Sequence, residues 1–246
     1  RSKEENAELV RYANEKGINY FDTAPGYCGD QSEDIMGIAF QDMPADFYCS
    51  TKGMPTQFDT ADKARAAVEK SLQRLGVEKI NFYHIWCLRK MEHYELAMKP
   101  GGQYEGLLKC KEEGLIDHIV CSSHQPGSEV RQIIEDGKVE GVLLGVNILN
   151  FPYRWDGVLA AHDSGCGVVA MNPLAGGLVP QNEDQLQFVA GEDETPTEAA
   201  LRFVISCPQI TVALNGFTTR EHVDMACRVA DASRPFSEEE LGGLRQ

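Results

Sequence analysis

An aspartate, a tyrosine and a lysine lie at the ends of two neighbouring predicted strands, where they could carry out acid–base chemistry. Asp22 ends one strand, Tyr27 follows it after a Pro25-Gly26 turn, and Lys52 ends the next strand. Because parallel strands end at the same edge of a sheet, we expect the three side chains to meet there. A lysine ammonium beside a phenol lowers the phenol pKa from about 10. The sequence therefore predicts a tyrosine that gives a proton to a carbonyl oxygen.

The elements that must position these residues are short apolar segments that alternate with helical patterns. The predicted strands are 18–23, 46–52, 79–86, 116–123, 141–148, 167–172 and 210–215. The predicted helices are 32–41, 60–75, 102–113, 127–136, 157–164, 196–206 and 219–230. This alternation is typical of right-handed parallel βαβ units. An open seven-stranded sheet would leave two unpaired edges, so we expect a (β/α)8 TIM-type barrel whose first strand is missing from this sequence.

One such barrel domain accounts for residues 1–246, with its chemistry on the loops after the strands. Helical patterns at 4–13 and 237–241 run to both ends of the sequence, so we expect the domain to be truncated at the N-terminus and at the C-terminus. The polar stretch 180–195 is predicted to be a mobile loop. The segment 88–104 is predicted to form one pocket wall with its own short helix.

Composition narrows the class of protein. Hydrophobic residues make up 42% of the chain and charged residues 25%, which is typical of a soluble globular protein. A net charge of -15 argues against binding to nucleic acid or to an anionic membrane. The eight cysteines form no CxxC pair, which predicts free buried thiols in the cytoplasm and no metal site. The sequence does not specify an oligomeric state.

Several motifs along the chain resemble those of the aldo-keto reductase superfamily. The matching segments are 17–24, Tyr27, 32–33, 50–52, 71–76, 172–177 and 216–222, and together they cover nearly the whole length. The resemblance implies a (β/α)8 barrel that reduces an aldehyde or ketone, a small-molecule carbonyl substrate, with NADP(H) or, alternatively, NAD(H). The family's catalytic tetrad of Asp, Tyr, Lys and His then places Asp22, Tyr27 and Lys52 in three of the four roles.

The fourth tetrad position departs from the family. Where the family pattern is Asp-x-Tyr-x-x-His, this chain has residues 81–86, so Trp86 occupies the place of the histidine. His84 lies two residues earlier on the same face of the strand, about 7 Å deeper in the barrel. It could take the histidine's role through a water, or the indole N–H of Trp86 could donate to the carbonyl. Trp86 and His124 are also predicted to line the substrate pocket.

The positions that hold the cofactor in the family are altered in part. The resemblance implies cofactor contacts from Ser122, Ser123, Asn147, Met171, Leu174, Gly176, Thr218, Arg220 and His222. Ser123 stands where asparagine is usual, and Met171 stands where an aromatic ring commonly stacks on the nicotinamide. The family's Glu-Asn pair near the adenine is replaced by Met225-Ala226. The turn at 173–177, which binds the pyrophosphate in the family, is intact.

Two other functions are compatible with the same residues. The replacement at Trp86 and the altered stacking position would suit a binding or regulatory barrel with little reductase activity. A redox lyase or isomerase that keeps its nicotinamide is the third reading, because fold alone does not decide function. The shape also resembles the branch of the family with a C-terminal ferredoxin-like cysteine cluster, which would place an iron–sulfur cluster beyond this sequence.

Overall fold

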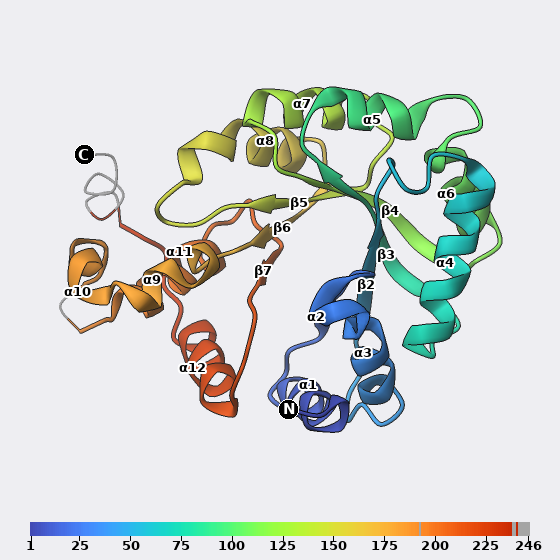
Figure 1. Ribbon diagram of the computed structural model, residues 1–246. Coiled ribbons are helices and arrows are strands. Elements are labelled where there is room, and N and C mark those ends of the chain that lie inside the picture. The colour runs from blue at the N-terminus through green and yellow to red at the C-terminus, as the bar shows by residue number, and fades with distance from the viewer. Residues whose placement is uncertain (192, 238–239, 241–246) are drawn as a thin grey trace. The chain divides into compact units, whose positions relative to one another are not determined.

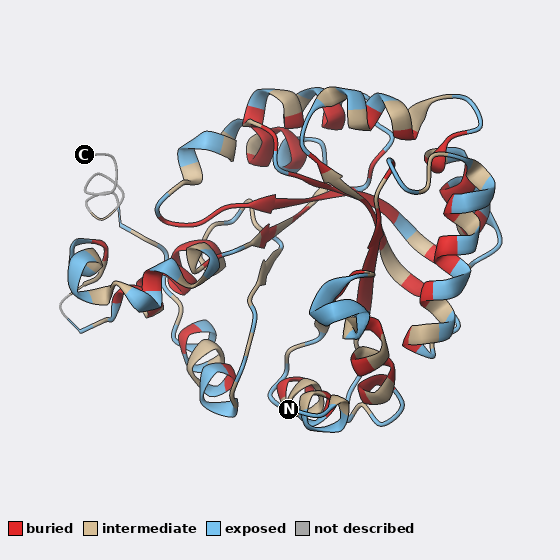
Figure 2. Ribbon diagram, in the orientation of Figure 1, coloured by how far each residue is buried: buried red, intermediate tan, exposed pale blue. Residues whose placement is uncertain are grey.

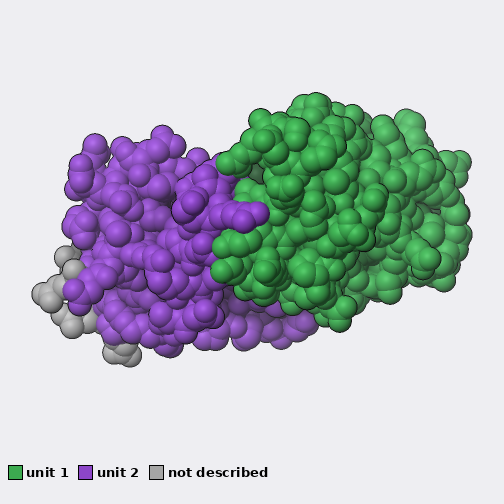
Figure 3. All heavy atoms as spheres, turned by 90° about the horizontal axis from the view of Figure 1, so that it is seen from below, with its two compact units in different colours: residues 1–125, 137–140 green, residues 126–136, 141–246 purple. Residues whose placement is uncertain are grey.

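The computed structural model describes residues 1–191, 193–237 and 240 of the 246 residues. The chain forms two compact units (Figure 3). Unit 1 comprises Arg1–Gln125 and Gly137–Glu140, and unit 2 comprises Pro126–Asp136 and Gly141–Gln246. No helix among the described residues is long and apolar enough to cross a membrane.

Unit 1 is built on four parallel strands that follow one another in chain order (Figure 1). The strands are β1 (Tyr20–Asp22), β2 (Tyr48–Gly53), β3 (Ile80–Leu88) and β4 (Ile116–Ser123). Its helices are α1 (Lys3–Glu15), α2 (Tyr27–Asp30), α3 (Ser32–Phe40), α4 (Ala61–Leu75), α5 (Met91–Met98) and α6 (Gln103–Glu112). Capping residues set the helix ends: Thr60 accepts the Lys63 N–H at the start of α4, and left-handed Gly76 ends it.

The core of unit 1 is the strand layer, which Figure 2 shows as mostly buried. Residues 49–53 of β2 and 119–123 of β4 are all buried. A parallel strand covered on both faces is an apolar run rather than an alternating pattern, which is why these strands were recognisable in the sequence. The polar side chains inside this layer therefore need partners, and they form the candidate site described below.

The described residues of unit 2 contain three parallel strands in chain order, β5 (Gly141–Gly145), β6 (Gly167–Met171) and β7 (Val212–Leu214). Its longer helices are α7 (Gly127–Glu135), α8 (Phe151–Asp163), α11 (Pro196–Ile205) and α12 (Arg220–Asp231). Short turns η1 (Ala175–Gly177), α9 (Leu178–Gln181), α10 (Glu183–Leu186) and η2 (Gln187–Val189) follow β6. Gly157 lets α8 lie against α7, because a Cβ there would approach the Val130 side chain to 2.7 Å.

The observed elements agree with most of the predicted ones. Each predicted strand is present, although β1, β5 and β7 are shorter than expected, and the predicted short helix in 88–104 is α5. Helix α8 begins at Phe151, six residues before its predicted start, because Pro152 fits the first turn of a helix instead of interrupting it. The prediction that 180–195 is a loop was incomplete. Short helices form there because Val189 is buried and Glu183 accepts the Thr197 hydroxyl at 2.5 Å.

The prediction that the cysteines are buried holds for only some of them. All eight are free thiols, but only Cys49, Cys110 and Cys121 are buried, and Cys28 is exposed.

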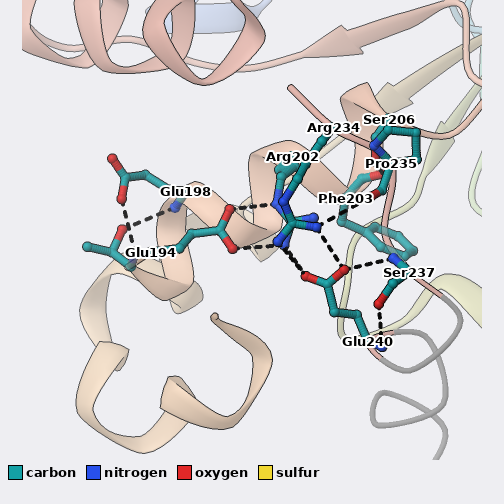
Figure 4. A network of polar contacts seen from close by, with 10 residues as sticks. Glu194, Glu198, Arg202, Phe203, Ser206, Arg234, Pro235, Ser237 and Glu240 are labelled. Carbon is teal, nitrogen blue, oxygen red and sulfur yellow. Dashed lines mark hydrogen bonds and ion pairs between the residues drawn. The ribbon is translucent and has the colours of Figure 1, made fainter. Parts of the chain in front are cut away.

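In unit 2, a buried arginine ties the last described residues to α11 (Figure 4). Arg202 is 4% exposed, and its guanidinium donates to both carboxylate oxygens of Glu194 and to Glu240. Arg234 donates to the same Glu240 carboxylate. The ring of Phe236 lies 3.9 Å from the Arg202 guanidinium carbon. These contacts compensate the burial of the guanidinium, so the segment 234–237 and Glu240 should contribute to the stability of unit 2.

We expect Glu240→Gln to lower the free energy of unfolding by about 1–2 kcal/mol, because charge-assisted hydrogen bonds to two arginines are lost. Hydrogen bonds from Arg234, above all, hold the pKa of Glu240 well below its usual range. A carboxyl group with a depressed folded-state pKa stabilises the protein above its unfolded pKa of about 4.3 and stops doing so as the pH falls. The difference between wild type and variant in urea unfolding should therefore shrink below about pH 4.

The control for this measurement is Glu69→Gln, which removes an exposed i,i+4 pair with Arg65 on α4. Such pairs contribute roughly 0.3–0.5 kcal/mol. If Glu240→Gln and Glu69→Gln lower the free energy of unfolding equally, the Arg202 contacts have no special role in stability.

Candidate active site

A buried ion pair between Asp22 and Lys52 is the centre of the site in unit 1. Lys52 is 1% exposed, and its ammonium donates to the Asp22 carboxylate and, at 2.7 Å, to the Thr23 carbonyl oxygen. The pairing of β1 with β2 sets Asp22 beside Ser50, so Lys52 lies one step further along the same face. The predicted meeting of Asp22 and Lys52 is therefore present in the structure.

The burial of Lys52 changes its acid–base behaviour. Desolvation lowers the pKa of its ammonium below the ordinary value, and the contacts with Asp22 act against that lowering. A second buried carboxylate, Glu33 of α3, also favours the charged form. Glu33 is itself held by the Thr51 hydroxyl at 2.7 Å. The lysine is thus fixed in place as the cation of a mostly buried cluster.

Tyr27 begins α2, directly after Gly26, whose φ of 84° turns the chain. Tyr27 is 40% exposed, so its side chain is accessible at the surface of unit 1. The Lys52 ammonium lies 5.4 Å from the centroid of the Tyr27 ring. The structure therefore brings together Asp22, Tyr27 and Lys52, as the sequence predicted.

The predicted direction of the Tyr27 pKa was wrong. Burial first, and then electrostatic interactions with Asp22 and Cys87, raise the pKa of Tyr27 to about 12. Lysine was expected to lower this pKa, but the burial of the phenol and the negative charge of Asp22 outweigh the effect of the ammonium. A phenol with this pKa stays protonated throughout the neutral range, which is the state that a proton donor requires.

His84 lies below this pair on β3, where it is 1% exposed. Its Nδ1 is 3.3 Å from the Cys121 carbonyl oxygen, and its Nε2 is 3.0 Å from the Ser50 hydroxyl. Burial, reinforced by Lys52, lowers the pKa of His84 to about 4. Because both ring nitrogens contact protein groups, His84 could reach a water only by breaking one of these contacts. Its substitution for the tetrad histidine stays a prediction.

Trp86 is placed beside Tyr27 by an irregularity in β3. The register between β3 and β4 shifts between Ile85 and Leu88, and Cys87 has a φ of 62°. Such a bulge redirects the side chains next to it. The rings of Trp86 and Tyr27 meet edge to face, with centroids 5.5 Å apart and an interplanar angle of 85°. Trp86 therefore forms a wall next to the phenol.

The other predicted residues of unit 1 lie at the end of β4. Ser122 and Ser123 are buried, whereas His124 is exposed. The Ser123 hydroxyl is 3.3 Å from the Leu88 carbonyl oxygen and accepts the Gln125 N–H at 3.1 Å. Ser123 thus has a structural role at this loop, and cofactor contacts from Ser122 and Ser123 stay predictions.

The predicted cofactor residues of unit 2 begin with Asn147, which follows β5. Its side-chain oxygen accepts the N–H groups of Leu149 and Asn150, and its amide donates to the Asn172 carbonyl at 3.1 Å. Asn147 therefore braces the loops after β5 and β6. Met171 is the last residue of β6 and is half-buried. A stacking role for Met171 stays a prediction.

The turn after β6 has a backbone suited to an anion. Asn172, Ala175, Gly176 and Gly177 all have positive φ values, of 56°, 52°, 69° and 93°. Leu174, with a φ of -95° and a ψ of 21°, directly precedes the left-handed Ala175. A right-handed residue followed by a left-handed one turns successive backbone N–H groups toward one side and makes an anion-binding concavity. This geometry fits the pyrophosphate position predicted for Leu174 and Gly176.

The start of α12 offers polar groups of the type that bind phosphate. The Thr219 hydroxyl caps the helix by accepting the His222 N–H, and the Thr218 hydroxyl is 3.1 Å from His222 Nδ1. Thr218, Arg220 and His222 are all exposed. Helix N-termini attract anions, and an arginine strengthens that preference. These residues have the chemistry that a 2′-phosphate requires, and their contact with the cofactor stays a prediction.

Two residues of unit 1 had no role in the sequence interpretation but contact the site. Ser50 lies between Asp22 and His84, and Cys87 lies in the bulge next to Trp86. The period of two along β2 places Ser50 on the face of Lys52, which could have indicated its contact with Asp22. Nothing in the sequence marks the bulge at Cys87.

Comparison with known proteins identifies the family of this arrangement. A model described as "Aldo/keto reductase family" matches residues 1–246. The uncharacterized oxidoreductase YqkF of Bacillus subtilis is 24% identical over 271 residues, which cover 96% of this chain and 85% of that protein.

Solved structures show the same fold. The holo form of an aldo-keto reductase from Bacillus halodurans has a TM-score of 0.80 at 21% identity, covering 100% of this chain and 87% of its own. An aldo-keto reductase from Klebsiella pneumoniae in complex with NADPH has a TM-score of 0.82 at 20% identity, covering 98% and 84%. The predicted fold class, a barrel of parallel strands alternating with helices, is confirmed.

We expect Asp22→Asn to destabilise the protein by about 3–5 kcal/mol, because the buried Lys52 ammonium loses its hydrogen-bonded counter-charge. In this variant the folded-state pKa of Lys52 falls further below its unfolded value of about 10.4. The unfolded state then binds more protons than the folded state, so the stability of the variant should rise between pH 7 and about pH 10. Urea unfolding at several pH values measures both effects.

The matched variant is Asp22→Asn with Lys52→Met, which removes both charges. It should be more stable than Asp22→Asn alone, because a buried pair can be replaced by neutral groups at little cost. A double variant as unstable as the single one would show that charge burial is not the cause.

Proposed function

We propose, on the premise that the chain belongs to the aldo/keto reductase family, that it reduces an aldehyde or ketone with NADP(H) and that Tyr27 is the proton donor. The observation that carries the proposal is the Lys52 ammonium, fixed by Asp22 and the Thr23 carbonyl, over the ring of an accessible tyrosine. Titratable groups that are perturbed by burial and by a specific charged partner cluster at functional sites.

The chemistry of the proton follows from these groups. A bound reduced nicotinamide supplies a hydride to the carbonyl carbon. As the carbonyl oxygen gains negative charge, the Tyr27 hydroxyl, still protonated because of its pKa of about 12, gives it a proton. The phenolate that forms is stabilised by the positive charge of Lys52, and Asp22 keeps that charge in position.

The proposed cofactor is NADP(H), supported by the residues of unit 2. The left-handed backbone around Leu174 and Gly176 would hold the pyrophosphate. Thr218, Arg220 and His222 at the start of α12 would hold the 2′-phosphate, which distinguishes NADP(H) from NAD(H). NAD(H) would be the cofactor if these three side chains make no such contact.

Trp86 occupies the position of the histidine in the family's catalytic tetrad. We propose that its indole N–H donates to the carbonyl oxygen, since its ring lies against Tyr27 and the imidazole of His84 is enclosed. The same replacement favours a second function, a barrel that binds a nucleotide but has little reductase activity. In that case Trp86 is only a wall of the pocket.

Tyr27→Phe should lower kcat by roughly 10²–10⁴-fold and leave the affinity for NADPH nearly unchanged, because the hydroxyl acts on charge that develops in the transition state. NADPH oxidation with a panel of aldehydes and ketones measures turnover, and quenching of tryptophan emission measures binding. Tyr12→Phe, a change on α1, is the control and should keep full activity. Retained turnover in Tyr27→Phe would refute the proposed role.

The variants Trp86→Phe and Trp86→His distinguish a Trp86 that donates a hydrogen bond to the carbonyl from one that only lines the pocket. Phe keeps an aromatic ring but lacks the N–H, so kcat should fall about tenfold, which corresponds to one hydrogen bond lost in the transition state. His restores the family residue and should keep or raise kcat. If Trp86→Phe turns over carbonyls as fast as wild type while Trp86→His does not exceed it, the indole N–H has no part in the reaction.

A further inference from the structure

The Ser50 hydroxyl lies between two hydrogen-bond acceptors inside unit 1. It donates to Asp22 Oδ1 at 2.6 Å and lies 3.0 Å from His84 Nε2, and Ser50 is fully buried. Asp22 continues the series to the Lys52 ammonium, and His84 continues it to the Cys121 carbonyl. We call the series from His84 through Ser50 and Asp22 to Lys52 the buried hydrogen-bond line.

The buried hydrogen-bond line has one hydroxyl proton for two hydrogen-bond acceptors. The Cys121 carbonyl oxygen only accepts, so His84 Nδ1 must carry a proton. A neutral imidazole then has a lone pair at Nε2, which needs a donor. Ser50 has a single hydroxyl proton, and it faces both this lone pair and the Asp22 carboxylate. The hydroxyl can serve only one of them at a time.

The charges around the line keep it in this state. The ammonium of Lys52 is paired with the Asp22 carboxylate, and the burial of His84 favours a neutral imidazole. From the neighbouring strand β1, the Tyr20 phenol lies within hydrogen-bond reach of the Ser50 side chain, and burial above all raises its pKa, so it stays neutral. Adding a proton would satisfy every contact, but it would place a further positive charge near Lys52. The two-position hydroxyl of Ser50 is therefore the adjustable group.

We propose that Ser50 is a positioning residue whose hydroxyl couples His84 to the Asp22–Lys52 pair, so that His84 influences Tyr27 through the buried hydrogen-bond line without touching the carbonyl. The expected effect of this coupling on kcat rests on the proposed function. When the hydroxyl donates to Asp22, it offsets part of the charge that holds Lys52. When it turns to His84 Nε2, Asp22 binds the ammonium alone.

The proton balance of this coupling is simple. Tyr27 gives its proton to the substrate oxygen and becomes a phenolate, which attracts the Lys52 ammonium. Asp22 then loses part of its counter-charge, and the Ser50 hydroxyl, which is shared between His84 Nε2 and Asp22, shifts further toward Asp22 to compensate. The hydroxyl rotates about its Cβ–Oγ bond, so no proton leaves or enters the line. Rotation of a hydroxyl needs no movement of the surrounding backbone, which suits a fully buried site.

The first test does not need turnover. In the wild-type protein, ¹⁵N NMR of His84 should show a ring protonated at Nδ1, with Nε2 accepting a hydrogen bond. Ser50→Ala should shift the Nε2 resonance toward that of an unbonded nitrogen and leave the Nδ1 resonance in place. Ser71→Ala removes another buried hydroxyl, on α4, and should change neither resonance.

Two results overturn the proposal in this test. One is a ring protonated at Nε2, and the other is an unchanged Nε2 resonance in Ser50→Ala. If Ser50→Ala does not fold, Ser50→Cys, which has a similar volume and a weaker donor, takes its place with the same expected direction of shift.

The second test is a double-mutant cycle in kcat. Ser50→Ala and His84→Leu should each lower kcat about tenfold with KM unchanged, because both act on the charge that Tyr27 develops. The double variant should be no slower than either single one, since the two residues act through one line. Effects that multiply would overturn the coupling.

The two tests separate this proposal from the proposed function. A wild-type protein that reduces no carbonyl but shows the NMR shift overturns the reductase proposal and leaves the buried hydrogen-bond line in place. Carbonyl reduction without the NMR shift overturns the line and leaves the reductase proposal in place.

Discussion

The burial of one positive charge organises unit 1. An ammonium removed from water costs several kcal/mol unless it is paired and fully hydrogen-bonded. Lys52 has the Asp22 carboxylate and the Thr23 carbonyl as partners, and both come from the end of β1. Strand β1 has only three residues, so the ion pair is a major tie between β1 and β2. A change in the register of these strands would leave the charge unpaired.

Buried charges outside the Asp22–Lys52 pair also need partners. Glu33 of α3 is a second buried carboxylate on the far side of β2, and Thr51 donates to it. Arg74 of α4 lies 3.4 Å from Glu33 and also donates to Asp34. Each charge is balanced by another one nearby, which links β2 to α3 and α3 to α4. The electrostatics of the candidate site therefore depend on how α3 and α4 pack.

Much of this arrangement was predictable from the sequence, for a physical reason. Buried parallel strands are apolar runs, and residues two apart share a face, so the strand ends that carry Asp22 and Lys52 could be placed together. The pKa of Tyr27 was not predictable, because it depends on how far its ring is buried and on how fully Asp22 balances Lys52. The bulge at Cys87 was not predictable either, since one inserted residue leaves no signal in an apolar run.

The position of the histidine decides what it can do in this chain. At the place of Trp86 an imidazole would lie against Tyr27, where it could donate to a substrate. Two residues earlier it stays on the same face of β3, but the Cys121 carbonyl and the Ser50 hydroxyl enclose it. Burial lowers its pKa to about 4, so at neutral pH it cannot supply charge to a substrate. What it can still do is compete with Asp22 for one hydroxyl proton, and Asp22 is the group that holds Lys52 beneath Tyr27.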